Sequence, residues 1–392
     1  MIKMKNVVVV SACRSPVGKI PGELNAIGEI PLLAKVFQEA VTRAGLPVQI
    51  EEALTGASFP IEKDNLCRKA ILYAGLSEMI SCTTISKTCA SSDEALAIAW
   101  HKIRNGAAGT ILVGGIEKIG NSPYVLHFMK QNVKRMLNKQ LPCRAEIEEL
   151  IQDNDMAYMN EVLARKAGIS RQAIDAHTYQ SILKAETAYR NGCFAEETVP
   201  IPYTENGITR YIIGDEFPQV VRSKREIYEA DPMFLKDGVL TRLNSAAIAE
   251  CAVAMLLMEE DTARTIGLQP IGRIVSVLNT AVPNEERGSS MAKCTQSILE
   301  RCGLAPFDVG LYSINDSFMV QSMLTVMEMG LDADRVNVDG GNIGLGYPIG
   351  ATGLRMCTSL LYEMQRRQVS LGLHVIGAGA NMAQAVVMQL DG

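Results

Sequence analysis

Short runs of β-branched and other apolar residues alternate, along most of the chain, with longer segments whose apolar side chains recur every three or four positions. The short runs predict strands, and the longer segments predict amphipathic helices. Strands are expected at residues 7–10, 85–87, 110–113, 271–277, 309–314 and 336–338. Strands and helices in alternation predict an α/β fold with largely parallel sheets.

The middle of the chain, from about residue 120 to 240, has a different pattern. It carries more charge and more helical segments, of which the longest runs from Asp155 to Gly192. Ser170 is a suitable N-cap inside this segment, and Gly192 is a suitable helix stop. We interpret the region as an insertion that covers one face of the α/β core.

The two ends of the chain share one plan. In each, a strand leads into a loop of small residues and then a buried helix, as in "ISKTCASSDEALAIAW" at 85–100 and "VNVDGGNIGLGYPIGATGLRMCTSLL" at 336–361. A further strand with glycines follows in each, as in "TILVGGIEK" and "LHVIGAGANMAQAVVMQL". This repetition predicts a duplicated fold with its site where the paired loops meet.

Composition narrows the class of protein. The 392 residues are 47% hydrophobic and 21% charged, with a net charge of -5, which is typical of a globular enzyme and gives no basic surface for nucleic acid. Ten cysteines without a Cys-x-x-Cys pair and four histidines predict neither disulfides nor a metal site. The basic start is interrupted by Arg14 and Pro16, so we expect a first strand there, and nothing later in the sequence predicts a membrane span. The cysteines without a disulfide framework predict a reducing, cytoplasmic location.

Cys89 has the clearest chemical meaning of any residue. It precedes a predicted helix that begins near Ala90 and keeps one side apolar, through Ala95, Leu96, Ala99 and Ile103. A helix N-terminus lowers the pKa of a thiol from its usual value of about 8.5, so we expect an activated nucleophile. Small neighbours, Thr88, Ala90, Ser91 and Ser92, leave clearance for a thioester. A structural buried cysteine is the alternative.

Over essentially its whole length the sequence resembles the thiolase superfamily. The motifs that carry the resemblance are "VVVVSACRSPVGK" at 7–19, "CAS" at 89–91, "GGIEKIGNSPYVL" at 114–126, the segment 168–201, "NDSF" at 315–318, "VNVDGGNIGLGYPIGATG" at 336–353 and "VIGAGANMA" at 375–383. The resemblance implies two βαβαβαββ halves in five layers, α-β-α-β-α, with an inserted helical loop domain. Its halves would be residues 1–265, including the loop domain at about 120–240, and residues 266–392.

The resemblance also implies a site. Cys89 would accept the acyl group, the backbone N–H groups of Cys89 and Gly377 would form an oxyanion hole, and Asn315 would hold a water for a second one. The thioester would be bound by a further set of residues: Met156, Asn244, Ser245, Phe318, Gly346 and Arg222. No cofactor beyond the acyl-CoA or acyl-carrier thioester is expected.

Several positions depart from the family pattern. Tyr347 stands where the family has the histidine of Gly-His-Pro, and tyrosine, with an ordinary pKa near 10, is a donor rather than a base at neutral pH. Val375 stands where the family has its second cysteine, and the neighbouring His374 could replace it as a base. Asp155 replaces a histidine of biosynthetic members, and "LNSAA" at 243–247 replaces Asn-Ala-Ser-Gly.

These residues predict a thiolase-like acyltransferase that forms an acyl-enzyme on Cys89, with a carbon–carbon bond as the product. The alternative is a catalytically impaired relative that serves as a structural or thioester-binding partner subunit, as Tyr347 and Val375 would allow. The resemblance implies a homodimer or homotetramer, with a thiolase-like partner subunit as a further option. The acyl chain and the acceptor are left open.

Overall fold

The structure is a computed structural model that describes residues 4–45, 47–62, 64–121, 156–220, 222–379 and 381–390. The strands of its first half are β1 (Val7–Arg14), β2 (Glu52–Ala57), β3 (Ser81–Ile85), β4 (Thr110–Glu117) and β7 (Cys251–Glu259). Those of its second half are β8 (Gly272–Ala281), β9 (Leu311–Ile314), β10 (Leu371–Gly377) and β11 (Met382–Gln389). The core helices are α1 (Glu29–Arg43), α2 (Leu66–Tyr73), α3 (Ser91–Arg104), α10 (Ser290–Cys302), α11 (Met319–Met329) and α13 (Thr352–Arg367).

Strand order shows the duplication directly. The described strands of the large sheet follow the order β3-β2-β4-β7-β1-β8-β11-β10-β9. The two halves meet where β1 pairs with β8, through residues 7–9 and 272–274. Counted outward from this seam, the strands of both halves follow the same order, with the last strand of each half next to its first strand. The expected duplicated α/β fold is therefore confirmed, but the prediction of a largely parallel sheet was wrong, because five of the eight pairings between the described strands of the large sheet are antiparallel.

Two strand predictions were wrong in position. Residues 336–338 form no strand, and Val336 makes only an isolated parallel bridge to Tyr312, at the place where β3 stands in the first half. β3 itself ends at Ile85, so the strand expected at 85–87 was placed too late along the chain. The chain leaves β3 early because Thr88, with φ of +48°, turns it toward α3.

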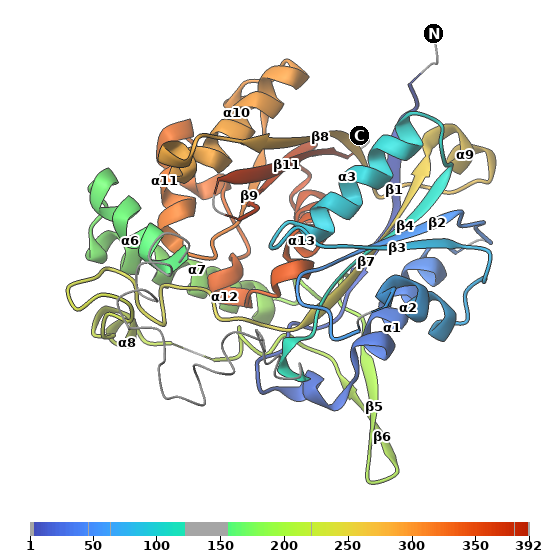
Figure 1. The fold of residues 1–392 in the computed structure, drawn as a ribbon, viewed down its shortest axis with the longest axis horizontal. Helices are drawn as coiled ribbons and strands as arrows, with labels where there is room; N and C mark the ends of the chain where they lie inside the picture. The colour runs from blue at the N-terminus through green and yellow to red at the C-terminus, as the bar shows by residue number, and fades with distance from the viewer. Residues whose placement is uncertain are drawn as a thin grey trace, which may run out of the picture.

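Three apolar clusters define five layers. One packs α1 and α2 on the outer face of the first sheet half, and another packs α10 and α11 on the outer face of the second. The third lies between the sheet halves and is centred on α3 and α13. Figure 1 shows this sequence of layers, from α10 through β8 and β11 to α3, and then through β4 and β7 to α1 and α2.

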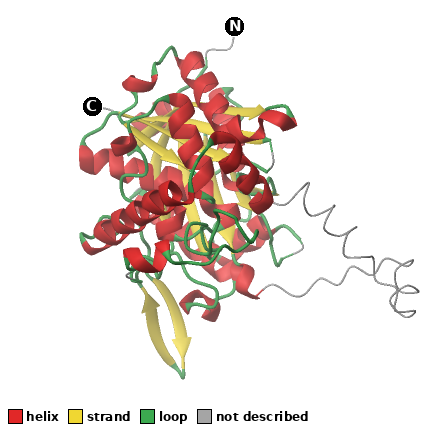
Figure 2. Cartoon of the chain, turned by 90° about the vertical axis from the view of Figure 1, so that its left-hand side faces the viewer, coloured by secondary structure: helices red, strands yellow, loops and turns green. Residues whose placement is uncertain are grey.

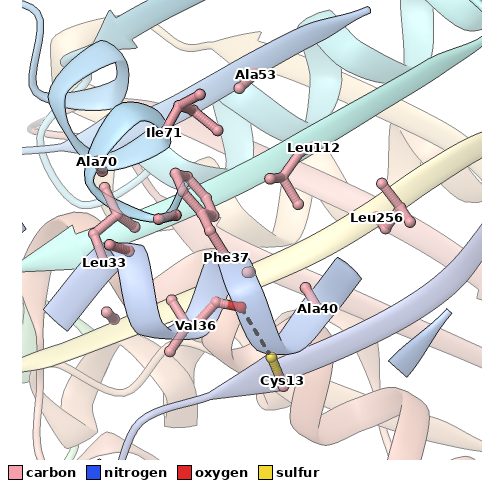
Figure 3. Packing of buried hydrophobic residues seen from close by; sticks show 14 of the residues in the cluster. Cys13, Leu33, Val36, Phe37, Ala40, Ala53, Ala70, Ile71, Leu112 and Leu256 are labelled. Atoms are coloured by element: carbon pink, nitrogen blue, oxygen red, sulfur yellow. Dashed lines mark hydrogen bonds between the residues drawn. The ribbon is translucent and has the colours of Figure 1, made fainter. Parts of the chain in front are cut away.

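The outer cluster of the first half shows how tightly these layers pack. Phe37 of α1 lies among Leu33, Ile71, Leu112 and other apolar side chains, as Figure 3 shows. Its ring comes so close to β4 that a Cβ on Gly114 would lie 2.7 Å from Phe37 Cε1, and the glycine is therefore required. A buried side chain of this size contributes roughly 1.5–3 kcal/mol to stability.

The inserted region packs its helices against the second half. Its described elements are α6 (Met156–Ala167), α7 (Arg171–Arg190), β5 (Ile201–Glu205), β6 (Ile208–Ile212) and α8 (Lys224–Tyr228). The expected limits of α7 are confirmed, because the Ser170 hydroxyl accepts the Ala173 N–H at 3.2 Å and Gly192 has φ of +70°. Strands β5 and β6 form a hairpin that projects from the body (Figure 2).

A buried arginine ties this region to the first strand. Arg14, at the end of β1, contacts Glu197 at 2.6 Å and holds Asp215 with two hydrogen bonds of 2.6 and 2.8 Å. All three side chains are excluded from solvent, so the cation compensates two carboxylates in one place. No helix among the described residues is long and apolar enough to cross a membrane.

Candidate active site

Cys89 lies where loops from the two halves meet. The left-handed Thr88 precedes it, and α3 starts two residues after it, with Ala90 as N-cap. The Ser91 hydroxyl holds the loop by accepting the Lys87 N–H at 2.9 Å and donating to the Thr88 carbonyl at 2.6 Å. The half-buried Cys89 packs against Ile376 and Ala378 of the second half, and the expected helix start near Ala90 is confirmed.

The thiol of Cys89 differs from the sequence prediction in one respect. Burial raises its pKa, and the negative charge of Glu117 adds to this, while the nearby Tyr347 hydroxyl lowers it. Because burial is the largest of these effects, the prediction of a lowered pKa from the helix end alone was wrong. The resting side chain is therefore a neutral thiol at pH 7.

Tyr347 reaches this thiol from the glycine-rich loop. Its backbone N–H donates to the Ala247 carbonyl at 2.8 Å, and its ring is buried. The hydroxyl faces the side chains of Cys89, Asn315 and Ser317 but closes no hydrogen bond of ordinary geometry with them. Burial and the adjacent thiol raise its pKa well above 10, so it stays protonated and can serve only as a donor.

Asn315 is held rigidly beside that hydroxyl. Its N–H donates to the Val375 carbonyl at 3.0 Å, and its side-chain oxygen accepts the Asn342 amide at 2.7 Å. Asn342 in turn accepts a hydrogen bond from the buried Arg355. With its oxygen engaged, Asn315 directs its amide donor toward the site, as holding a water or an oxyanion requires.

Strand β10 carries three of the predicted positions. Gly377 ends the strand next to the residues that contact Cys89, and a Cβ built on it would meet nothing within 4 Å. Val375 packs in the outer apolar cluster of the second half. His374 faces the opposite side and is fully buried, with its ring nitrogens directed at the Ser313 carbonyl and at Asp93. This placement offers the substrate no access to His374, so its role as a base stays an untested prediction that the geometry disfavours.

Most of the predicted thioester-binding residues lie around one part of the second half. Ser245 bridges to Phe318 at the start of α11, and Gly346, with φ of +90°, leaves no room for a side chain beside Phe217. Asn244 is buried and uses its side chain to hold its own loop and Asp175. Met156 is the first residue of α6. Asp155 and residues 122–126 of the "GGIEKIGNSPYVL" motif lie outside the described residues.

A cavity of about 270 Å³ adjoins these residues. Three cationic side chains line it, Lys19, Arg222 and Arg242, and the other lining residues are apolar or uncharged. Its wall continues to the site, because Ile248 forms a parallel bridge to Tyr347. Its three cations make the cavity suited to an anionic ligand.

Sequence reasoning missed some of these residues. Lys19 and Arg242 are isolated cations in the sequence, and only folding brings them to Arg222. Glu117 was noticed only as part of a motif, although burial raises its pKa to about 7 within electrostatic reach of Cys89. Its carboxylate accepts the Gly350 N–H at 2.8 Å, so it also positions the glycine-rich loop. The one sequence signal that could have identified Glu117 is a carboxylate at the end of a buried strand.

Comparison with known proteins gives consistent matches over the chain. The family descriptions "Thiolase, N-terminal domain" and "Thiolase, C-terminal domain" match residues 7–261 and 268–390. The acetyl-CoA acetyltransferase of Escherichia coli strain K12 is 32% identical, over 98% of this chain and 99% of its own length. An acetyl-CoA acetyltransferase of Cupriavidus necator is 33% identical, over 98% of this chain and all of its own length.

Solved structures agree with these matches. The acetyl-CoA acetyltransferase of Syntrophomonas wolfei superposes with a TM-score of 0.90 at 28% identity, and covers 99% of this chain and all of its own. That of Bacillus anthracis superposes with a TM-score of 0.90 at 29% identity, over all of both chains. The duplicated architecture is therefore that of solved acetyl-CoA acetyltransferases.

The contact between Tyr347 and Cys89 makes a prediction about pH. Alkylation of Cys89 by iodoacetamide should rise with pH through a midpoint above the ordinary value of about 8.5, because only the thiolate reacts. Tyr347→Phe removes the hydroxyl that lowers this pKa, so the midpoint should move to still higher pH. Peptide mass spectrometry after timed alkylation measures both.

Cys82 is an internal control in the same samples. Its hydrogen bond with Cys67 lowers the pKa of Cys82 to about 7, and it is half-buried on β3. Its alkylation midpoint should stay unchanged in the Tyr347→Phe variant. An identical Cys89 midpoint in both proteins would show that the hydroxyl does not act on the thiol.

Proposed function

The chain belongs to the thiolase family and is an acyltransferase, and from this premise we propose that it forms an acyl-enzyme on Cys89 from an acyl-CoA and passes the acyl group to a carbon acceptor. One observation carries the proposal. The Tyr347 hydroxyl, a donor from the second half, lies next to the Cys89 thiol, and Asn315 lies beside that hydroxyl.

The choice of coenzyme A as carrier is supported by the cationic cavity. Coenzyme A carries three phosphate groups, and three cationic side chains line the cavity, Lys19, Arg222 and Arg242. Ile248, another lining residue, forms a bridge to Tyr347. Several relatives are named acetyl-CoA acetyltransferases, which agrees with a coenzyme A thioester.

In the first step the Cys89 sulfur attacks the thioester carbonyl. A bond forms between that sulfur and the acyl carbon, the bond to the coenzyme A sulfur breaks, and the thiol proton of Cys89 ends on coenzyme A. The negative charge that develops on the carbonyl oxygen would be stabilised by the backbone N–H groups of Cys89 and Gly377. Because the two thiols are of similar energy, the exchange is nearly balanced, and the thiolate fraction of Cys89 is the attacking form.

In the second step a bond forms between a carbon nucleophile and the acyl carbon, and the bond between the acyl carbon and the Cys89 sulfur breaks, which leaves Cys89 as a thiolate. Tyr347 remains protonated, so it would donate a hydrogen bond to the acceptor's carbonyl oxygen next to Asn315. Val375 offers no base to remove a proton from the acceptor. The acceptor would therefore be one whose carbon is already acidic or one that forms its carbanion by decarboxylation.

The alternative of an impaired partner subunit has less support. It was motivated by Tyr347 and Val375, yet Tyr347 contacts the nucleophile as a donor and Asn315 keeps its rigid setting. The comparisons name active acyltransferases and give no support to an inactive subunit. A site kept only for structure would not need an unpartnered buried hydroxyl, which is costly.

Cys89→Ala tests the nucleophile. Wild-type protein incubated with acetyl-CoA should gain the mass of one acetyl group, and the Cys89→Ala variant should gain none, because no other thiol faces the Tyr347 hydroxyl among the residues described. Intact-protein mass spectrometry measures the gain. Cys82→Ala is the matched control and should label as the wild type does. Labelling that persists in Cys89→Ala would place the nucleophile elsewhere.

Arg222→Gln tests the carrier. The change should raise KM for acetyl-CoA by roughly 3- to 10-fold and leave kcat unchanged, since an exposed charge at a phosphate contributes modestly and acts on binding alone. The acetyl thioester of pantetheine, which lacks the phosphates, should show no change. Arg225→Gln is the control, because Arg225 pairs with Glu229 outside the cavity. Equal effects in both variants would exclude a specific phosphate contact.

An even-numbered homo-oligomer is part of the proposal. β3 is an outer strand of the sheet, and its residues are half-buried or exposed, so it is free to pair across a twofold axis. We expect a dimer or tetramer by light scattering at micromolar concentration. Assembly with a thiolase-like partner subunit is the alternative, and co-expression would test it. A monomer at that concentration would contradict this expectation.

A further inference from the structure

Three polar side chains meet in the apolar layer beneath the nucleophile. Asp93 of α3, Cys357 of α13 and His374 of β10 are each fully buried, and their polar atoms lie within 4.8 Å of one another. His374 Nε2 is 3.5 Å from Asp93 Oδ1, and Cys357 Sγ is 3.9 Å from the same oxygen. The apolar cluster between the sheet halves surrounds them, with Gln384 as a further buried polar neighbour.

The hydrogen-bond partners decide how many protons the imidazole holds. His374 Nδ1 is 3.0 Å from the Ser313 carbonyl oxygen, and a carbonyl can only accept, so Nδ1 carries a proton. Nε2 then faces a carboxylate, which is also an acceptor when ionised. The repulsion between two acceptors is removed by a second proton, which lies either on Nε2 or on the carboxyl group.

Asp93 is in a position that favours its ionised form. It is the third residue of α3, where the positive end of the helix stabilises a negative charge. Its other oxygen, Oδ2, lies against Gly353 at the start of α13, so close that a Cβ there would be 1.3 Å away. The starts of two helices thus surround one carboxylate. These helix starts favour a second proton on the imidazole, whose Nε2 lies 3.5 Å from Asp93 Oδ1.

Both strands of the last hairpin hold this same residue. Gln384 of β11 donates from Nε2 to the Asp93 carbonyl oxygen at 2.8 Å, and Gln384 pairs with Ile376 of β10. The side chain of Asp93 is held by His374, three residues before Gly377. Asp93 itself lies one helical turn after Cys89. Asp93 of α3 is therefore linked to both β10 and β11, the strands on either side of the turn that follows Gly377.

We propose that the imidazolium of His374 and the carboxylate of Asp93 form a positioning pair that fixes the Cys89 sulfur relative to the Gly377 N–H. The inference rests on the acyl-enzyme chemistry proposed above. It assigns His374 a role through Asp93, in place of a base that meets the substrate. A buried ion pair is no more stabilising than apolar packing of the same volume, so its advantage here is a fixed geometry between two elements that come from different halves.

The protonation state is tested first, by a measurement that does not depend on activity. The chain has only four histidines, so ¹⁵N-histidine labelling gives few signals, and His374→Gln identifies the one of interest. At pH 7 the long-range ¹⁵N–¹H spectrum should show both nitrogens of His374 protonated. In Asp93→Asn, which keeps the shape and removes the charge, the pattern should become that of a neutral ring. A neutral or metal-bound pattern in the wild type would overturn the proposal.

The positioning role is tested with a paired substitution. In Asp93→Leu/His374→Leu both charges are removed together, and leucine has the branching of aspartate, so the variant should keep a melting temperature close to that of the wild type. The rate of Cys89 acylation by acetyl-CoA should nevertheless fall by about 10²-fold, as misplacement by about 1 Å costs, with KM unchanged. A folded double variant that acylates at the wild-type rate would show that the pair is only structural.

The outcomes separate this inference from the proposed function. If the wild type itself gains no acyl group on Cys89, the proposed function fails, while the ¹⁵N spectrum still reports the pair. If the wild type is acylated and the double variant is acylated equally fast, the function stands and the positioning role is wrong. Should the double variant not fold, the spectra of the wild type and of Asp93→Asn still decide the protonation state on which the inference depends.

Discussion

The close approach of two helix N-termini is the constraint on which the rest of the site depends. Helices α3 and α13 lie in the layer between the sheet halves, and their first turns touch, with the Leu354 N–H donating to the Ser92 hydroxyl at 3.1 Å. A Cβ on Gly353 or on Gly115 would collide with this contact region. Because the helices start here, the loops that precede them, one with Cys89 and one with Tyr347, must end next to each other.

This packing explains the bare loop at 340–353 better than substrate access alone. Several of its glycines are enforced by neighbouring protein atoms, since an added Cβ would lie 2.1 Å from Asp316, 2.6 Å from Ala185, 2.5 Å from Phe217 or 2.4 Å from the Ser58 N–H. The loop is wedged between both halves and the inserted helices. In the resting state the Tyr347 hydroxyl forms no hydrogen bond that would fix its position. The rigid loop therefore holds this side chain in place.

Tyr347 stands where the family has a histidine, so a hydrogen-bond donor replaces a base, and this changes which reactions the site can support. A protonated tyrosine can stabilise charge on an oxygen but cannot take a proton from a neutral thiol or from a carbon. Acyl exchange between thiols of similar energy is compatible with this change, whereas condensation with an unactivated acyl-CoA needs a base that neither Tyr347 nor Val375 supplies. The proposed imidazolium–carboxylate pair then has a clear use, since a site without a positioned base relies more heavily on the geometry of its nucleophile and its donors.

Local patterns in the sequence determined the class of fold and the duplication, and they singled out Cys89 as the proposed nucleophile. Alternating short and long apolar periods specified strands and helices, Ser170 and Gly192 specified the limits of α7, and small residues before a helix singled out Cys89. These features depend on residues close together in the chain. The chemical reason is that capping, periodicity and steric clearance are local properties.

Tertiary structure alone decided the charges and partners of the site. The sequence placed Cys89 at a helix end and predicted a lowered pKa, whereas burial between two halves raised it. It offered His374 as a base, whereas strand β10 turns that side chain toward Asp93, 281 positions earlier in the chain. Lys19, Arg222 and Arg242 meet only in the fold. Desolvation and pairing depend on which distant residues share a volume, and no local pattern in the sequence encodes that.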